Sequence, residues 1–218
     1  MDWKFDIAAK IGAVTREVID KEHDGKPARI VVLERTYPAP AEDVWDALTS
    51  AERIARWLTP ITGDLQLGGR YQLEGNAGGE ILTCKPPRDL AVTWEFAGTV
   101  TWVDVHLDED PDGGTRLRLE HLAHIDPDDP FMQQFGPGAV GIGLDLSLLG
   151  LDAHLADPDQ PKGDDAELLA SSGGQELMRR SGEAWLDADI AAGTPEDDAR
   201  RRGAATIAAY TGGADPGR

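Results

Sequence analysis

The sequence is short of cysteine and of long apolar runs, and each shortage excludes a class of protein. The one cysteine, Cys84, rules out an intramolecular disulfide and a cysteine-built zinc site. The most apolar stretch, residues 136–155, contains five glycines and two aspartates, which excludes a good membrane span. The residues after Met1 are charged and lack the apolar core of a signal peptide. We therefore expect a soluble, cytoplasmic protein.

Positive charge is also scarce. The 218 residues include 21 Lys and Arg against 40 Asp and Glu, which gives a formal net charge of −19. Proteins bind nucleic acids and anionic membranes through basic surfaces, so we expect neither as a partner. Ten acidic residues and one lysine lie within residues 126–175, and the sequence assigns this acidic segment no role. The chain is long enough to bury a sizeable core without disulfides or metals.

Hydrophobic periodicity predicts a sheet followed by helices. β-prone runs occupy residues 14–19 and 30–36, and two short helices are expected over 42–48 and 50–58. Alternating strands with short connections then predict an antiparallel meander between residues 71 and 125. Apolar residues at helical spacing predict three helices, over 138–156, 176–191 and 195–210. The absence of a βαβ rhythm makes a doubly wound fold a poor fit.

Several segments together resemble a known superfamily. They are Tyr37–Thr49, Arg53–Trp57, Leu67–Tyr71, Leu90–Trp94 and Thr115–His121. In these segments the chain is similar to the SRPBCC (START-like, helix-grip) superfamily, in the branch related to the heat-shock-chaperone ATPase activator. The resemblance implies an α+β fold in which a curved antiparallel sheet wraps around a long C-terminal helix. It implies one domain over 1–218, with a core at about 28–156 and a helical addition at about 157–212.

The resemblance implies a cavity between the sheet and the long helix, but no single activity. Similar proteins bind lipids, sterols, hormones or polyketides there, while others are cyclases, hydrolases or chaperone co-factors. We therefore expect a protein that binds a small apolar or amphipathic molecule. A cyclase- or hydrolase-type enzyme and a chaperone-accessory or protein-interaction module remain alternatives. Similar proteins are often dimers, so a homodimer is also expected.

Two motifs suggest cofactors, and neither has the required context. Residues 136–141 fit the dinucleotide pattern G-x-G-x-x-G, but no strand precedes them, so close backbone packing explains the glycines better. The order Glu120-His121-Leu122-Ala123-His124 is wrong for a zinc protease motif, and on a strand the two histidines point to opposite faces. We expect no cofactor and no metal.

The candidate ligand contacts are mostly aromatic or aliphatic residues on the inner side of the predicted sheet and helix. A tryptophan on its own is more often a core residue, but several on a concave sheet could line an apolar pocket. His121 shares its strand phase with Leu117 and Leu119, so it is either a polar pocket residue or a satisfied core histidine. The sequence names no catalytic group. The expected contacts are Trp57, Tyr71, Trp94, Phe96, Trp102, Leu119, His121, Leu144, Asp145 and Leu148, with Leu67 beside them on the wall.

Overall fold

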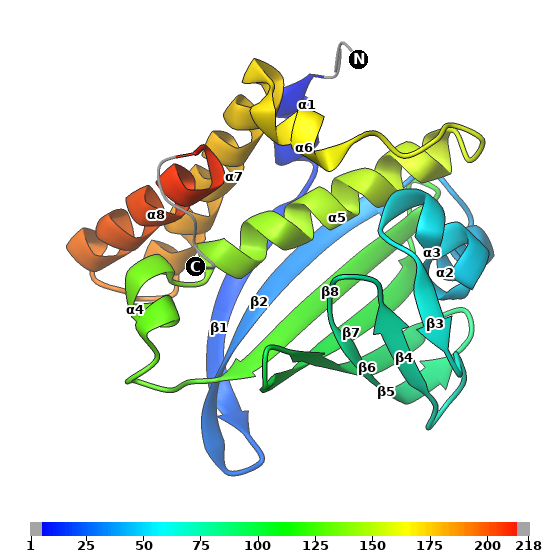
Figure 1. The fold of residues 1–218 in the computed structure, drawn as a ribbon, viewed down its shortest axis with the longest axis horizontal. Coiled ribbons are helices and arrows are strands. Elements are labelled where there is room, and N and C mark those ends of the chain that lie inside the picture. Colours follow the sequence, from blue (N-terminus) through cyan, green and yellow to red (C-terminus); the bar gives the residue numbers. More distant parts are fainter. Residues whose placement is uncertain (1–5, 213–218) are drawn as a thin grey trace. The chain divides into compact units, whose positions relative to one another are not determined.

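The fold is that of a computed structural model, which describes residues 6–212 (Figure 1). The strands are β1 (Thr15–His23), β2 (Lys26–Tyr37), β3 (Ile61–Gly63), β4 (Arg70–Leu73), β5 (Gly78–Lys85), β6 (Asp89–Phe96), β7 (Thr99–Glu109) and β8 (Thr115–His124). The helices are α1 (Ile7–Gly12), α2 (Ala41–Thr49), α3 (Ala51–Trp57), α4 (Pro130–Phe135), α5 (Gly138–Ala156), α6 (Asp165–Ala170), α7 (Ser172–Ala191) and α8 (Glu196–Tyr210). The predicted helix over 138–156 is confirmed by α5.

The strands form one sheet in the order β1-β2-β8-β7-β6-β5-β4-β3. From β3 to β8, each strand pairs antiparallel with the next in sequence. This meander follows from the short connections, since two to six residues are too few for the crossover that parallel neighbours need. Figure 1 shows the curvature of the sheet. The predicted α+β class, with a curved antiparallel sheet and helices at the C-terminal end, is confirmed.

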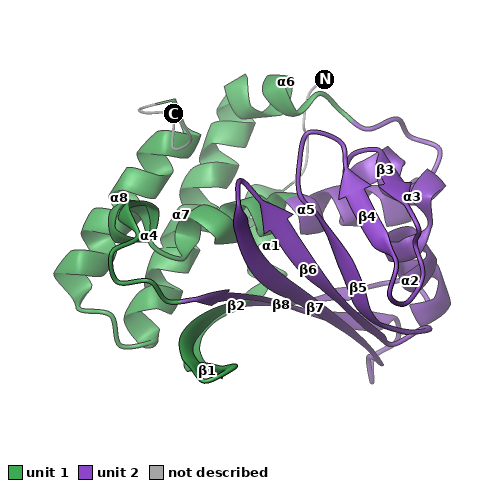
Figure 2. Ribbon diagram, turned by 60° about the horizontal axis from the view of Figure 1, so that its bottom comes forward, with its two compact units in different colours: residues 1–31, 125–146, 163–218 green, residues 32–124, 147–162 purple. Residues whose placement is uncertain are grey.

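The chain divides into two compact units, coloured in Figure 2. One contains residues 32–124 and 147–162, which include most of the sheet and the C-terminal half of α5. The other contains residues 1–31, 125–146 and 163–218. Both β2 and α5 pass from one unit into the other. That the whole chain is one folding domain stays a prediction.

In the unit that contains the C-terminal helices, α7 packs against α8, α1 and β1, and α8 also packs against α4. The glycine-rich start of α5 belongs to this packing. A Cβ added at Gly141 would lie 2.2 Å from the indole of Trp185, and one at Gly138 would lie 3.4 Å from the Cβ of the same residue. The glycines therefore let Trp185 of α7 lie directly on α5. Close packing explains the G-x-G-x-x-G pattern.

The beginnings of the last helices differ from the prediction. The α7 helix begins at Ser172, four residues before the predicted start, because the Ser171 side chain caps it by accepting from the Gly174 N–H. Pro195, and not the polar Thr194 before it, occupies the cap position of α8. The Thr194 hydroxyl instead donates to the buried carboxylate of Asp189, at 2.8 Å.

Candidate functional site

Strand register decides which side chains share a face of the sheet. Trp94 of β6 pairs with Thr101 of β7, and Val103 of β7 pairs with His121 of β8. Directly paired residues point to the same side, and so do residues two apart along a strand. Trp94, Thr101, Val103 and His121 therefore lie on one face. We call it the inner face.

The inner face is the one that carries the C-terminal half of α5. On the opposite face, Arg118 of β8 forms an ion pair with Glu34 of β2, so the residues next to Glu34 in sequence point inward. Arg35 is that neighbour, and Tyr37, two residues further along the strand, points the same way. Both contact α5. The Tyr37 hydroxyl donates to the Leu148 carbonyl at 3.2 Å, and Arg35 forms an ion pair with Asp152 at 2.6 Å.

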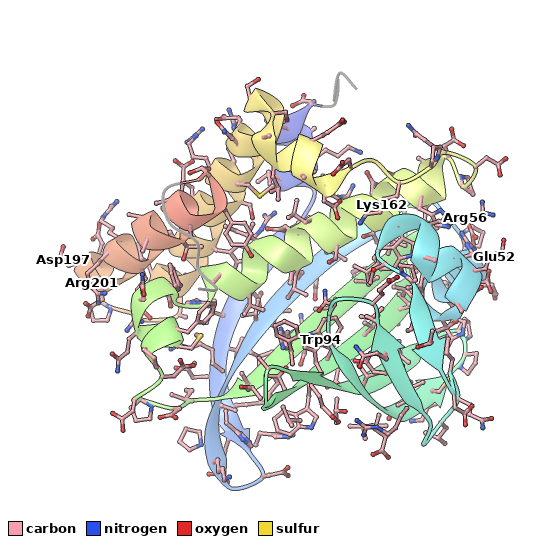
Figure 3. The ribbon with its side chains drawn as sticks, in the orientation of Figure 1. Glu52, Arg56, Trp94, Lys162, Asp197 and Arg201 are labelled. Atoms are coloured by element: carbon pink, nitrogen blue, oxygen red, sulfur yellow. The ribbon has the colours of Figure 1, made fainter. Side chains whose placement is uncertain are left out.

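One part of the inner face is apolar but incompletely covered. Val105, Leu107 and Leu117 on this face are at most 7% exposed. Six other inner-face residues, on β6, β7 and β8, are only half-buried, although they lie in the middle of the sheet. We call this set the inner wall: Leu90, Val92, Trp94, Thr101, Leu119 and His121. Trp94 is labelled in Figure 3 among the side chains of the sheet.

A packed cluster supports the inner wall on its β5 side. Ile54 of α3, Tyr71 of β4 and Ile81 of β5 are buried together, and Leu90, Val92 and Trp94 pack against them. The Tyr71 hydroxyl donates to the Thr93 carbonyl at 2.8 Å, which anchors β4 to β6. Burial raises the pKa of Tyr71, so its hydroxyl stays protonated. The wall is therefore a fixed surface.

His121 and Thr101 supply the polar side-chain groups of the inner wall, and His121 is the titratable one. Its Nε2 lies 2.7 Å from the Thr101 hydroxyl, while its Nδ1 is buried and has no hydrogen-bond partner among the described residues. Burial lowers the pKa of His121 to about 4 because the cation would lose its hydration. The imidazole is therefore neutral at physiological pH. Its predicted place on the same face as Leu117 and Leu119 agrees with the register.

Trp102 was predicted on the same side of the sheet as Trp94, but the structure does not bring it to this wall. It pairs with Thr93, one position away from the Trp94–Thr101 pair, so its ring lies on the outer face. There it contacts the ring of His124 in a tilted arrangement, with 5.0 Å between ring centroids and 59° between the ring planes. His121 and His124 thus lie on opposite faces, as their spacing predicted.

Asp145, another predicted ligand contact, is held by side chains of the protein. Arg16 donates to both of its carboxylate oxygens, at 3.0 and 2.9 Å, and the Ser181 hydroxyl and Trp185 Nε1 donate to one of them. Asp145 is 8% exposed. Four hydrogen bonds occupy it, so it fixes α5 to α7 and β1 rather than orienting a ligand. Leu144, its half-buried neighbour, lies in the same unit and stays a prediction.

The other predicted contacts differ in how deeply they are buried. Trp57 is buried, donates to the Ala47 carbonyl at 2.9 Å and lies against Gly150 of α5. Leu148 is 3% exposed on α5. Phe96 shares the inner face with Trp94 but is 56% exposed at the end of β6. Leu67 is 64% exposed and is not among the six inner-wall residues.

Sequence reasoning missed three residues of the wall. Leu90 and Val92 alternate with Trp94 along β6, so period two alone could have found them. Thr101 follows from the hairpin turn. Ala97 and Gly98 both have positive φ, 49° and 83°, as a two-residue type I′ turn requires. That turn pairs Phe96 with Thr99, and hence Trp94 with Thr101.

Comparison with known proteins identifies the family of this chain. Residues 38–153, more than half of the chain, match the family described as "Activator of Hsp90 ATPase homolog 1-like protein". The chain belongs to this family. It is a branch of the SRPBCC superfamily, as the sequence segments indicated. No curated protein sequence compared with the chain matches it.

Solved structures agree with membership of the Hsp90-activator-like family. The crystal structure of CalU16 from Micromonospora echinospora is 30% identical, covers 81% of this chain and 98% of its own, and has a TM-score of 0.64. The solution NMR structure of CalU16 is 31% identical, with coverages of 83% and 97% and a TM-score of 0.67. Protein MLL2253 from Mesorhizobium loti is 27% identical, with coverages of 61% and 100% and a TM-score of 0.52.

The protein has a surface cavity of about 470 Å³, and none of the six inner-wall residues lines it. None of the predicted ligand contacts lines it. Its sides are prolines, alanines, exposed charged side chains and the buried Leu107 of the inner face, without an aromatic residue. The inner wall is the stronger candidate for apolar ligands because it presents Trp94 and three aliphatic side chains. The cavity is lined by Pro38, Ala39, Pro40, Ala41, Glu42, Pro87, Arg88, Leu107, Glu109 and Gly114.

Two further features bear on cofactors and membranes. Within residues 6–212, no group of three or more His, Cys, Asp or Glu side chains is placed to hold a metal ion. One helix of the same region, α5, is long and apolar enough to cross a membrane. It carries Asp145 and Asp152, each paired with an arginine.

Proposed function

We propose that this protein binds a small apolar or amphipathic molecule on the inner wall. The observation that carries the proposal is the half-buried state of Leu90, Val92, Trp94 and Leu119 in the middle of the sheet. Apolar side chains at such positions are normally covered by the core, as Leu107 and Leu117 are here. An apolar surface left partly uncovered beside a few polar groups is typical of a small-molecule site.

The inner wall can supply enough energy for useful affinity. Removing about 200 Å² of apolar ligand surface from water contributes roughly 5 kcal/mol. The ring of Trp94 is held by the packed cluster around Tyr71 and Ile81, so little of this energy is lost to ordering the site. The wall also removes apolar surface of its own from water when a ligand covers it. The two contributions together allow dissociation constants around the micromolar range.

Binding fits the wall better than turnover does. Acid–base catalysis of a cyclase or hydrolase reaction needs at least two positioned groups. His121 is the only titratable side chain among the six wall residues. Tyr71 uses its hydroxyl to hold Thr93, and Arg35 and Asp152 bind each other. The same wall could hold a ligand without changing it.

The family description raises a rival function, an accessory role on a chaperone ATPase. That role would act through a surface for another protein and would not need an open wall inside the sheet. The two functions separate in one experiment, which measures the thermal unfolding midpoint and intrinsic tryptophan fluorescence with a panel of 2-naphthol, palmitate, cholesterol and a tetracyclic aromatic polyketide. We expect at least one compound to raise the midpoint and change the fluorescence with a dissociation constant in the micromolar range. If none does so, ligand binding is contradicted.

A further inference from the structure

The hydroxyl of Thr101 joins two neighbours on the inner wall. It lies 2.7 Å from His121 Nε2 and 3.2 Å from the carbonyl oxygen of Trp94. A hydroxyl group has one proton to donate. The carbonyl of Trp94 can only accept, so the Thr101 proton must point to it if both hydrogen bonds form. Thr101 then accepts from His121, which requires a proton on Nε2.

This arrangement defines the other nitrogen of the ring. A neutral imidazole carries one proton, so a protonated Nε2 leaves Nδ1 with a lone pair. Burial keeps His121 neutral at pH 7 by lowering its pKa to about 4. Nδ1 is buried and has no partner within residues 6–212. A buried acceptor without a donor is costly, and the few that native proteins keep often have a function.

We propose that His121 Nδ1 accepts a hydrogen bond from a hydroxyl group of the ligand, so that the inner wall selects apolar molecules carrying an O–H donor, such as phenols. This inference rests on the proposed function and names the class of molecule that the wall would prefer. The ligand packs its apolar body on Trp94, Val92 and Leu119, and its hydroxyl takes the place of the side chains that cover Nδ1. The ligand O–H then supplies the donor that the protein lacks.

The charge of the site separates phenols from acids. A carboxylate has no proton to donate at pH 7, and it would face the lone pair of a neutral ring rather than a cation. Arg35, a buried guanidinium on the inner face, has its charge balanced by Asp152, which lies 2.6 Å from its Nη2, while its Nε has no hydrogen-bond partner among the described residues. The wall therefore disfavours fatty acids relative to hydroxylated ligands of similar size.

The test compares three probes of one shape: 2-naphthol, 2-methoxynaphthalene and 2-naphthoate. Isothermal titration calorimetry of the full chain at pH 7 should show 2-naphthol binding about tenfold more tightly than either of the others. In His121→Leu the advantage over 2-methoxynaphthalene should fall to about twofold or less. Thr101→Val removes the acceptor that keeps the proton on Nε2, so it should reduce the same advantage. Thr101→Ser keeps a hydroxyl at this position and should preserve the advantage.

A spectroscopic measurement on the wild-type protein checks the inference without relying on variants. Nitrogen-15 NMR of the histidine rings should show a protonated Nε2 and an unprotonated Nδ1 for His121, with the Nδ1 signal shifting on addition of 2-naphthol. A proton on Nδ1, or equal affinity for 2-naphthol and 2-methoxynaphthalene, would overturn the inference but leave ligand binding intact. Failure of all three probes and of the wider panel would instead contradict the proposed function itself.

Discussion

Trp94 and Trp102 lie on adjacent strands of one hairpin and on opposite faces of the sheet. Trp94 pairs with Thr101 and packs on the inner cluster. Trp102 pairs with Thr93 and contacts the tilted ring of His124 on the outer face. The two-residue turn at Ala97-Gly98 fixes this relationship, since a one-residue change of register would exchange the two faces. The two rings therefore provide a matched pair for separating ligand contact from general packing.

Asp145→Ala should destabilise the protein strongly. The change leaves the buried guanidinium of Arg16 without its carboxylate partner, and the Ser181 and Trp185 donors also lose their acceptor. We expect a loss of about 3–5 kcal/mol in the free energy of unfolding, measured by urea denaturation. Glu196→Ala removes an exposed pair with Arg200 and serves as the control, with an effect below about 1 kcal/mol. A cost for Asp145→Ala equal to that of the control would show that the cluster is not a structural clamp.

Gly141→Ala and Gly143→Ala should differ although both lie in α5. A Cβ at position 141 would lie 2.2 Å from the Trp185 ring, whereas one at 143 meets its nearest neighbour at 3.6 Å. Overpacking should cost Gly141→Ala about 1–3 kcal/mol in the free energy of unfolding. Gly143→Ala should be neutral or stabilising by up to about 1 kcal/mol, because alanine favours helix. Thermal and urea unfolding of both variants measure this, and equal effects would contradict the close contact between α5 and Trp185.

Stability should fall as the pH drops below about 6.5, in part because of His121. Its pKa is about 4 in the folded protein and near 6.5 in the unfolded chain, so between these values the unfolded state binds more protons. The group contributes no pH dependence above that window and up to about 3 kcal/mol of lost stability across it. His154 acts in the same direction, because burial lowers its pKa, while His106 opposes it, because Asp89 raises its pKa.

The comparison with His121→Gln isolates this contribution. Urea denaturation of both proteins at pH 7.5, 6.5, 5.5 and 4.5 should give wild-type stability that falls more steeply than that of the variant. The remaining histidines and carboxyl groups contribute equally to both and cancel in the difference. Parallel curves would mean that His121 titrates normally and is not buried as described.

Local sequence patterns were enough to predict many of the strands and helices. The roles of some side chains depend instead on partners that are distant in sequence. Period two and period 3.6 placed the strands of the meander and the helix at 138–156, because those signals lie within single elements. The role of Asp145 could not be inferred in this way. Its partners Arg16, Ser181 and Trp185 are 129, 36 and 40 residues away in sequence. Helical spacing shows only that Asp145 lies on a largely apolar helix.

The error at Trp102 has a different cause, since the deciding signal was local. Both tryptophans alternate correctly within their own strands, but their relative phase depends on the length of the turn between them. Counting Ala97-Gly98 as a two-residue turn would have placed Trp102 on the outer face. His121 was placed on the correct face because its strand contains Leu117 and Leu119, which fix the phase.

The affinities of Trp94→Leu and Trp102→Leu for one ligand test the central claim most directly. Isothermal titration calorimetry with 2-naphthol, or with the tightest compound of the panel, should show at least a tenfold loss of affinity for Trp94→Leu, because the ring that packs on the ligand is gone. Trp102→Leu should bind within about twofold of the wild type, because its ring lies on the other face of the sheet. Equal losses in the two variants, or a larger loss in Trp102→Leu, would contradict a binding site on the inner wall.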